Sequence, residues 1–174
     1  MQKMQKEEPQ LSIYEYFFEG GLNNTFVFET NADILYGVKF KPAEYIIPNK
    51  AYSDSIFEMT IEVLDIPAGK KLYPDKIFPP TIATIIKDFF YKIHQPILMY
   101  ICDSSDDKQL VRHREFNQWF EEFASAQLAK TEFIFIDNFQ KRFPVSLFLE
   151  INHPNRQEIL DLFFDEANNF QNDK

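Results

Sequence analysis

The chain has 174 residues, of which 45% are hydrophobic and 17% aromatic, so it can bury a large core and is not of a disordered or low-complexity class. Its length is typical of one domain. The formal net charge of −9 disfavours nucleic acid as a partner, because a phosphate backbone attracts Lys and Arg. Such an acidic surface either simply keeps a protein soluble or attracts a basic protein partner.

The compartment is predicted from the cysteine content and from the start of the chain. Cys102 is the only cysteine, so no intramolecular disulfide can form, which is typical of a reducing compartment. Residues 1–10 are polar and predict a frayed tail without the apolar centre of a signal peptide, followed by a single globular domain over 11–174. No apolar run approaches the ~20 residues that span a bilayer. We therefore expect a cytoplasmic protein that does not associate with a membrane.

The N-terminal part of the chain contains three stretches with strand character and one ambiguous segment. Residues 25–30 and 34–40 flank a turn sequence, Asn31-Ala32-Asp33, and together predict a β-hairpin. In the stretch 57–63, apolar residues alternate with polar ones, which predicts a strand with one face in water. The Tyr- and Phe-rich segment 11–18 is either a further strand or a docking segment.

Two amphipathic helices separated by a short buried strand are predicted next. A helix over 81–94 follows two prolines and carries an apolar stripe of Ile82, Ile85, Ile86, Phe89, Phe90 and Ile93. After Pro96, the apolar run 97–101 predicts a strand buried on both faces. A second helix over 107–127 has on its core face Phe116, Trp119, Phe120 and Phe123.

A strand pair over 131–136 and 145–151 precedes a last helix. Asn155 and Glu158 have the spacing of a capping box at the start of this helix. The helix is predicted to bury Ile159, Leu160, Phe163 and Phe164. The fold class is therefore α+β (mixed α/β), with a single mixed, largely antiparallel sheet of about six strands and three packed helices, in the order β-β-β-α-β-α-β-β-α.

Several short motifs resemble an uncharacterised family of short bacterial proteins, a domain of unknown function. The motifs are Thr81-Ile82, Asp88-Phe89-Phe90, Tyr100-Ile101-Cys102-Asp103-Ser104-Ser105-Asp106, Arg112-His113-Arg114 and Trp119-Phe120. The resemblance extends to the aromatic strands before Leu64 and to Asn152-His153-Pro154, so it covers most of the chain. It implies no activity, cofactor or partner.

A second resemblance concerns the order of elements alone. Three strands, a helix, a strand, a helix and a strand pair are similar to the core of the GNAT acetyltransferase fold. That resemblance implies a coenzyme A pyrophosphate held by backbone amides of a Gly-rich turn at the start of the first central helix. The matching segment here, 72–81, has no glycine, and its prolines remove amide donors. The sequence thus departs from the GNAT pattern where the coenzyme would bind.

One polar loop is the candidate ligand or interaction site. It comprises Asp103, Ser104, Ser105, Asp106 and Asp107, at the carboxyl end of a predicted buried strand, where α/β sheets often bind ligands. These residues either contribute to a ligand or cation site, or cap the following helix and pair with Arg112 or Arg114. The two arginines diverge by about 200° around the helix, so only one of them can face the loop. We expect the structural role.

The remaining residues give no strong catalytic signature. His94, His113 and His153 lack metal-ligand spacing with one another or with Cys102, so no metal site is predicted. Asp103 beside Cys102 disfavours the thiolate that a nucleophile requires. The sequence has neither a Walker loop nor a Rossmann glycine pattern, and no cofactor is predicted.

The predicted function is that of a small cytoplasmic bacterial binding or regulatory protein without catalytic activity, with a protein as its partner. The alternative is a GNAT-like N-acyltransferase, active or degenerate. The two hypotheses differ in the expected geometry of the helix start at 79–82. Free amides facing a cleft would favour the enzyme, whereas a start plugged by Phe78 or Tyr73 would favour the binding protein. The sequence leaves the oligomeric state open.

Overall fold

The computed structural model describes residues 12–101, 109–123, 126–136 and 139–172. Its elements in chain order are β1 (Tyr16–Gly20), β2 (Thr25–Glu29), β3 (Leu35–Pro42), a 3-10 turn (Ser53–Ser55), β4 (Ile56–Asp65), α1 (Phe78–Lys92), β5 (Ile97–Ile101), α2 (Gln109–Phe123), β6 (Leu128–Ile136), β7 (Arg142–Glu150) and α3 (Arg156–Asn172). Within the described part of the chain, no helix has the length and apolarity needed to cross a membrane.

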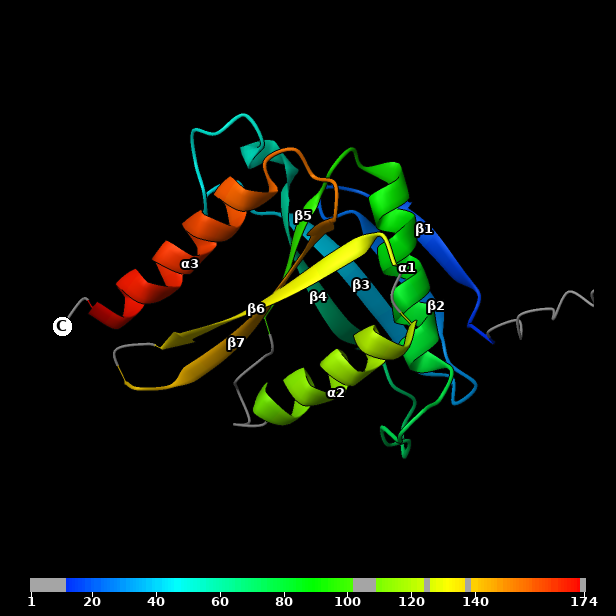
Figure 1. The fold of residues 1–174 in the computed structure, drawn as a ribbon. Coiled ribbons are helices and arrows are strands. Elements are labelled where there is room, and N and C mark those ends of the chain that lie inside the picture. Colours follow the sequence, from blue (N-terminus) through cyan, green and yellow to red (C-terminus); the bar gives the residue numbers. More distant parts are fainter. Residues whose placement is uncertain (1–11, 102–108, 124–125, 137–138, 173–174) are drawn as a thin grey trace, which may run out of the picture.

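All the strands form one mixed sheet in the order β1-β2-β3-β4-β5-β7-β6 (Figure 1). Neighbouring strands are antiparallel except β4 and β5, which pair in parallel from Ile56 opposite Ile97 to Met59 opposite Tyr100. The α+β class is confirmed, but the described sheet has seven strands instead of six. The additional strand is β1, which the Tyr- and Phe-rich segment forms by pairing with β2.

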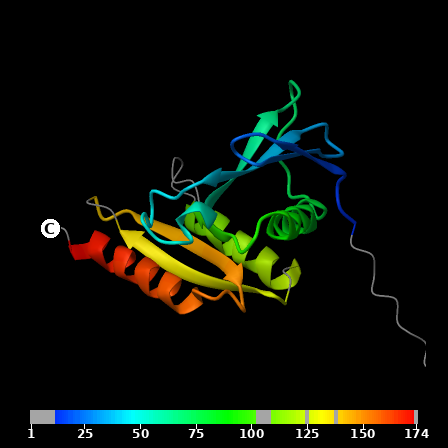
Figure 2. The same cartoon turned by 90° about the horizontal axis from the view of Figure 1, so that it is seen from above.

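The helices lie on both faces of the sheet (Figures 1 and 2). One core contains apolar residues of β2, β3 and β4 together with those of α1 and α2. A second core, on the other face, lies between α3 and the buried side chains of β5, β7 and β6. The strand β7 contributes to both cores, because successive side chains of a strand point to opposite faces.

The α1 prediction is confirmed at its apolar stripe. Ile82, Ile86, Phe89 and Phe90 are all buried against the sheet. The Phe89 ring stacks on Phe40 with a centroid separation of 3.9 Å and meets Phe57 edge-on at 5.1 Å. The stripe therefore attaches α1 to β3 and β4 through aromatic contacts in addition to ordinary apolar burial.

Two predictions about α3 are wrong. Phe164 is 59% exposed, whereas Ile159 and Phe163 are buried. The predicted capping box does not form, because Glu158 pairs with Lys50 at 2.5 Å. The Asn155 amide instead donates to Nδ1 of His153 at 3.2 Å. The His153 ring, which precedes the helix, thus accepts the Asn155 amide in place of the Glu158 carboxylate.

Candidate functional site

The predicted site loop, Asp103 to Asp107, lies outside the described residues. Its arginine neighbours are on α2, where Arg112 is half-buried and Arg114 is exposed. That difference agrees with the divergence expected from helical geometry. Which arginine the loop faces remains a prediction.

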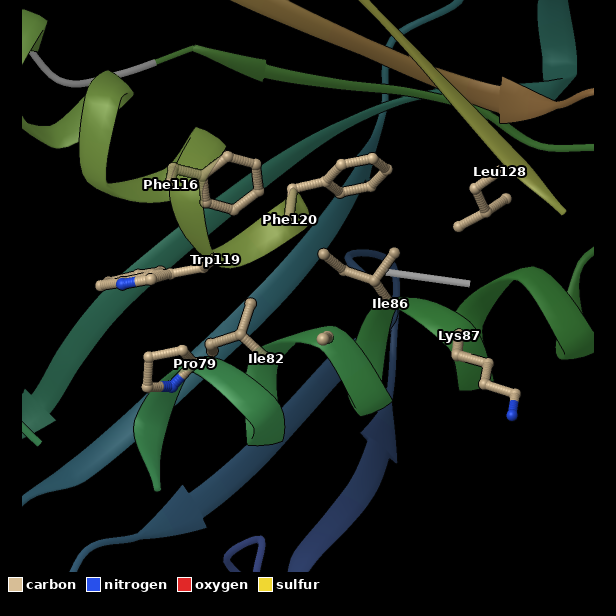
Figure 3. Close-up of a pocket in the computed structure, with 9 residues that line it drawn as sticks. Pro79, Ile82, Ile86, Lys87, Phe116, Trp119, Phe120 and Leu128 are labelled. Atoms are coloured by element: carbon tan, nitrogen blue, oxygen red, sulfur yellow. The ribbon is translucent and has the colours of Figure 1, made fainter. Parts of the chain in front are cut away.

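The structure brings together a different set of residues, in an apolar groove between α1 and α2 (Figure 3). Eight apolar residues line it together with Lys87, and seven of the eight come from the two helices: Pro79, Ile82, Ala83 and Ile86 of α1, and Phe116, Trp119 and Phe120 of α2. Leu128 at the start of β6 completes the lining. The groove and the open space above it amount to about 380 Å³, of which only about 20 Å³ is comparable with a closed cavity. It is therefore a shallow, apolar depression between two helices.

The floor and walls of the groove differ in burial. Ile82, Ile86 and Phe116 are buried and form the floor, whereas Trp119 and Phe120 are only partly buried. In Figure 3 the apolar side chains of α1 point toward those of α2, while the Lys87 amine points away from them. An apolar occupant would therefore cover the half-buried aromatic rings of α2.

Trp119 also connects the groove to the start of α1. Its ring meets Phe78 edge-on at 5.8 Å, and Phe78 packs against Tyr36 at 4.8 Å. This stack places the first residue of α1 between the sheet and α2. The Phe78 ring at the start of α1 is therefore held between Tyr36 and Trp119.

Hydrogen bonds occupy the polar groups around the same helix start. Asp75 accepts the Ile77 amide at 2.8 Å and the Tyr14 hydroxyl at 2.7 Å. Thr81 accepts the Tyr14 amide at 2.9 Å and donates to the Ile77 carbonyl at 2.7 Å. Burial, and then the bond to Asp75, raise the pKa of the Tyr14 hydroxyl above its usual value. The segment before β1 therefore docks on the start of α1 and occupies donors and acceptors there.

A polar cluster lies beside the groove, between α2 and β6. Lys130 donates to the side-chain oxygen Oδ1 of Asn117 and pairs with Glu132 at 2.6 Å, and its amine lies 5.7 Å from the Phe120 ring centroid. Asn117 donates to Glu132 at 2.5 Å and lies 3.2 Å from Nε2 of His113. The Phe120 ring lines the groove and also lies beside the Lys130 amine. The polar cluster is therefore in contact with one wall of the groove.

The charges of this cluster depend on one another. Partial burial acts to raise the pKa of Glu132, but Lys130 and His113 outweigh it and hold that pKa below its usual value. His113 Nε2 lies 3.4 Å from the Glu132 carboxylate, so a protonated imidazole would form an ion pair there. Within the described residues, His113 Nδ1 and Ser146 Oγ are buried without a hydrogen-bond partner.

The described part of the chain contains no group of three or more His, Cys, Asp or Glu side chains arranged to hold a metal ion. The groove and the cluster together contain apolar rings, one ion pair, an amide and an imidazole. Such a set suits recognition of an apolar group.

Comparison with known proteins identifies the family. A family of unknown function, DUF6169, matches residues 75–165, slightly more than half of the chain. The chain belongs to this family. The matched segment contains the whole groove and the whole polar cluster, whereas β1 to β4 precede it. No curated protein and no solved structure matches the chain.

Sequence reasoning missed most of this site. The spacing of Trp119 and Phe120 predicts a core face, and both side chains do pack against the core. Helical spacing does not show, however, how completely a neighbouring helix covers such a face. Lys130 and Glu132 gave a usable signal, since both lie at alternate positions of one predicted strand and so share a face. That signal identifies two neighbours on a strand but does not show that α2 lies over them.

Proposed function

We propose that this chain is a non-catalytic binding protein whose groove between α1 and α2 receives an apolar side chain of a protein partner. The observation that supports the proposal is the groove itself, in which apolar residues of two helices leave Trp119 and Phe120 partly uncovered. Covering such rings removes apolar surface from water, which favours association. Aromatic residues are also common at the energetic centres of protein interfaces.

The size of the groove favours a side chain over a whole cofactor. Small-molecule sites typically enclose ~300–1,000 Å³ and bury most of the ligand. The groove reaches about 380 Å³ only when its open part is counted. The enclosed part of the groove measures only about 20 Å³. A partner would therefore lay an apolar side chain across the half-buried rings and contact the rims of α1 and α2.

The acyltransferase hypothesis receives less support. A coenzyme pyrophosphate needs free amides at a helix start, and two of the first three residues of α1, Pro79 and Pro80, have none. Phe78 and Asp75 also occupy the adjacent space and donors. Calorimetry with acetyl-CoA separates the hypotheses, because micromolar binding, about −8 kcal/mol, would favour the enzyme.

Two leucine substitutions on α1 test the proposal. Ala83→Leu places extra bulk in the groove, whereas Tyr91→Leu changes a residue that is 91% exposed and outside the groove. Affinity capture from the native cell should recover the same partner with the wild type and Tyr91→Leu, and lose it with Ala83→Leu. Emission from Trp119, the only Trp, should then report titration of that partner. Equal capture by all three proteins would contradict the groove as the binding site.

We place this binding protein in the bacterial cytoplasm. The proposal is supported by the single cysteine and by the bacterial family that the sequence motifs resemble.

A further inference from the structure

One face of the strands β1 and β2 carries exposed apolar side chains. Tyr16 and Phe28 are directly opposite each other, and both belong to the core on the α1 side of the sheet (Figure 2). Because side chains alternate along a strand, the next opposite pair, Phe17 and Val27, points away from α1. Phe17 is 60% exposed and Val27 is half-buried. The described helices therefore leave this pair uncovered.

The apolar face continues across β3 to Leu64 of β4. Val27 is opposite Gly37, and a Cβ atom at Gly37 would come within 3.0 Å of the Leu64 side chain. The absence of a side chain at Gly37 thus lets Leu64, which is 43% exposed, lie over β3. Phe17, Val27 and Leu64 together form what we call the apolar strip. Contiguous exposed apolar surface that is bordered by polar groups is typical of a protein interaction site.

Three carboxylates border the apolar strip at β1 and β2. Glu15 and Glu29 come directly after the opposite pair Tyr16 and Phe28 along the two strands, so they are neighbours on the exposed face. Glu19 lies at the register shift of β1, toward the other end of that strand. All three are exposed, and within the described residues none of them forms an ion pair or a side-chain hydrogen bond. Like charges at neighbouring positions of a sheet are unfavourable, so a bound cationic group would relieve this repulsion.

The cations of the chain near these strands are engaged elsewhere. Lys92 of α1 lies over the Phe18 ring at 5.1 Å, on the opposite face of β1. Lys39 of β3 is on the exposed face, but it pairs with Glu62 at 2.5 Å. A second copy bound through the same face would bring three more carboxylates to it, which opposes self-association. Charge complementarity instead selects a partner that carries Lys or Arg.

We infer that the exposed face of β1 and β2 binds a basic segment of a protein partner. An apolar side chain of that segment packs on Phe17 and Val27, and the Lys or Arg side chains that flank it pair with the three carboxylates. The groove between α1 and α2 lies on the α1 side of the sheet, so the two surfaces are separate. The inference therefore does not depend on the function proposed for the groove.

Peptide titration followed by NMR tests this binding face. The probe is an amidated peptide that alternates Lys with Thr around a central Phe, added to the isotope-labelled wild type at low salt. Amide shifts should change along β1 and β2, and the same peptide with Glu in place of Lys should not bind. The inference would be overturned if the Lys peptide did not bind at about 1 mM, or if the shifts centred on the groove.

Two matched pairs of variants locate the contacts. Phe17→Ala should weaken peptide binding about tenfold, as loss of an aromatic anchor does, whereas Phe164→Ala removes a ring that is similarly exposed (59%) and should have no effect. Glu15→Lys should weaken binding about fivefold at low salt, and Glu166→Lys, the same charge change at an exposed site of α3, should have less effect. Ala83→Leu should leave binding unchanged, which separates this face from the groove. Equal effects within either pair would overturn the inference, as would a wild-type dimer that Phe17→Ala dissociates.

Discussion

Phe89→Ala tests the packing that joins α1 to the sheet. The Phe89 side chain is 1% exposed, stacks on Phe40 with nearly parallel rings, and has edge contacts with Phe57 and Phe90. Truncating a fully buried Phe typically costs about 3–5 kcal/mol, because transfer energy is lost and a cavity remains. Aromatic pairs add ~0.5–1.5 kcal/mol beyond area burial, so we expect the upper half of that range.

Urea unfolding followed by far-ultraviolet circular dichroism measures this loss as a change in the free energy of unfolding. In a domain of this length each kcal/mol lowers Tm by about 2–4 °C, so a loss of about 4 kcal/mol lowers it by roughly 8–16 °C. A double-mutant cycle with Phe40→Ala should give a coupling energy of ~0.5–3 kcal/mol, since the two rings are in contact.

Phe164→Ala is the matched control, because it removes the same ring from a site that is 59% exposed. Its effect should stay within about 0.5 kcal/mol. The packing argument would be refuted by a loss below ~1 kcal/mol for Phe89→Ala, or by equal losses for the two variants.

Two further predictions concern pH and the arginines of α2. Burial lowers the pKa of His153, so its contribution to stability is complete above about pH 6.5 and is lost as the pH falls below that value. His153→Asn keeps an acceptor near the Asn155 amide but cannot titrate. The urea midpoint of this variant should therefore fall less than that of the wild type between about pH 7.5 and about pH 5.5. An equal fall in the two proteins would contradict the role of His153. Arg112→Met should reduce stability by more than ~1 kcal/mol without abolishing partner capture, whereas Arg114→Met, at an exposed site, should cost less; equal unfolding midpoints would contradict the distinction.

The sequence by itself determined the elements whose pattern is locally complete. The stripe of α1 marks a face at helical spacing. The alternation over 57–63 correctly predicts the strand β4 and the burial of Phe57 and Met59, but Val63 at its far end is 41% exposed. The apolar run of β5 likewise indicates a strand covered on both faces, as observed for Ile97, Leu98 and Met99. In each case the periodicity within a few residues carries the information, so no knowledge of the partner element was needed.

Only the tertiary structure decided which neighbours these elements meet. The segment before Gly20 is a strand because β2 offers it a free edge, and Tyr14 docks on α1 because Asp75 and Thr81 lie there. Phe164 is 59% exposed because the buried face of α3 is the one that carries Ile159 and Phe163, and Phe164 lies about 100° around the helix from Phe163.

The groove and the polar cluster were also decided only by the tertiary structure. They depend on the distance and rotation between α1, α2 and β6, which are set by contacts between residues far apart in the chain. Trp119 is half-buried because α1 does not cover it fully, and Lys130 of β6 meets Asn117 because α2 packs on the neighbouring strand β7. Local periodicity specifies which face of an element is apolar, but the fit between faces determines how much of each side chain remains accessible.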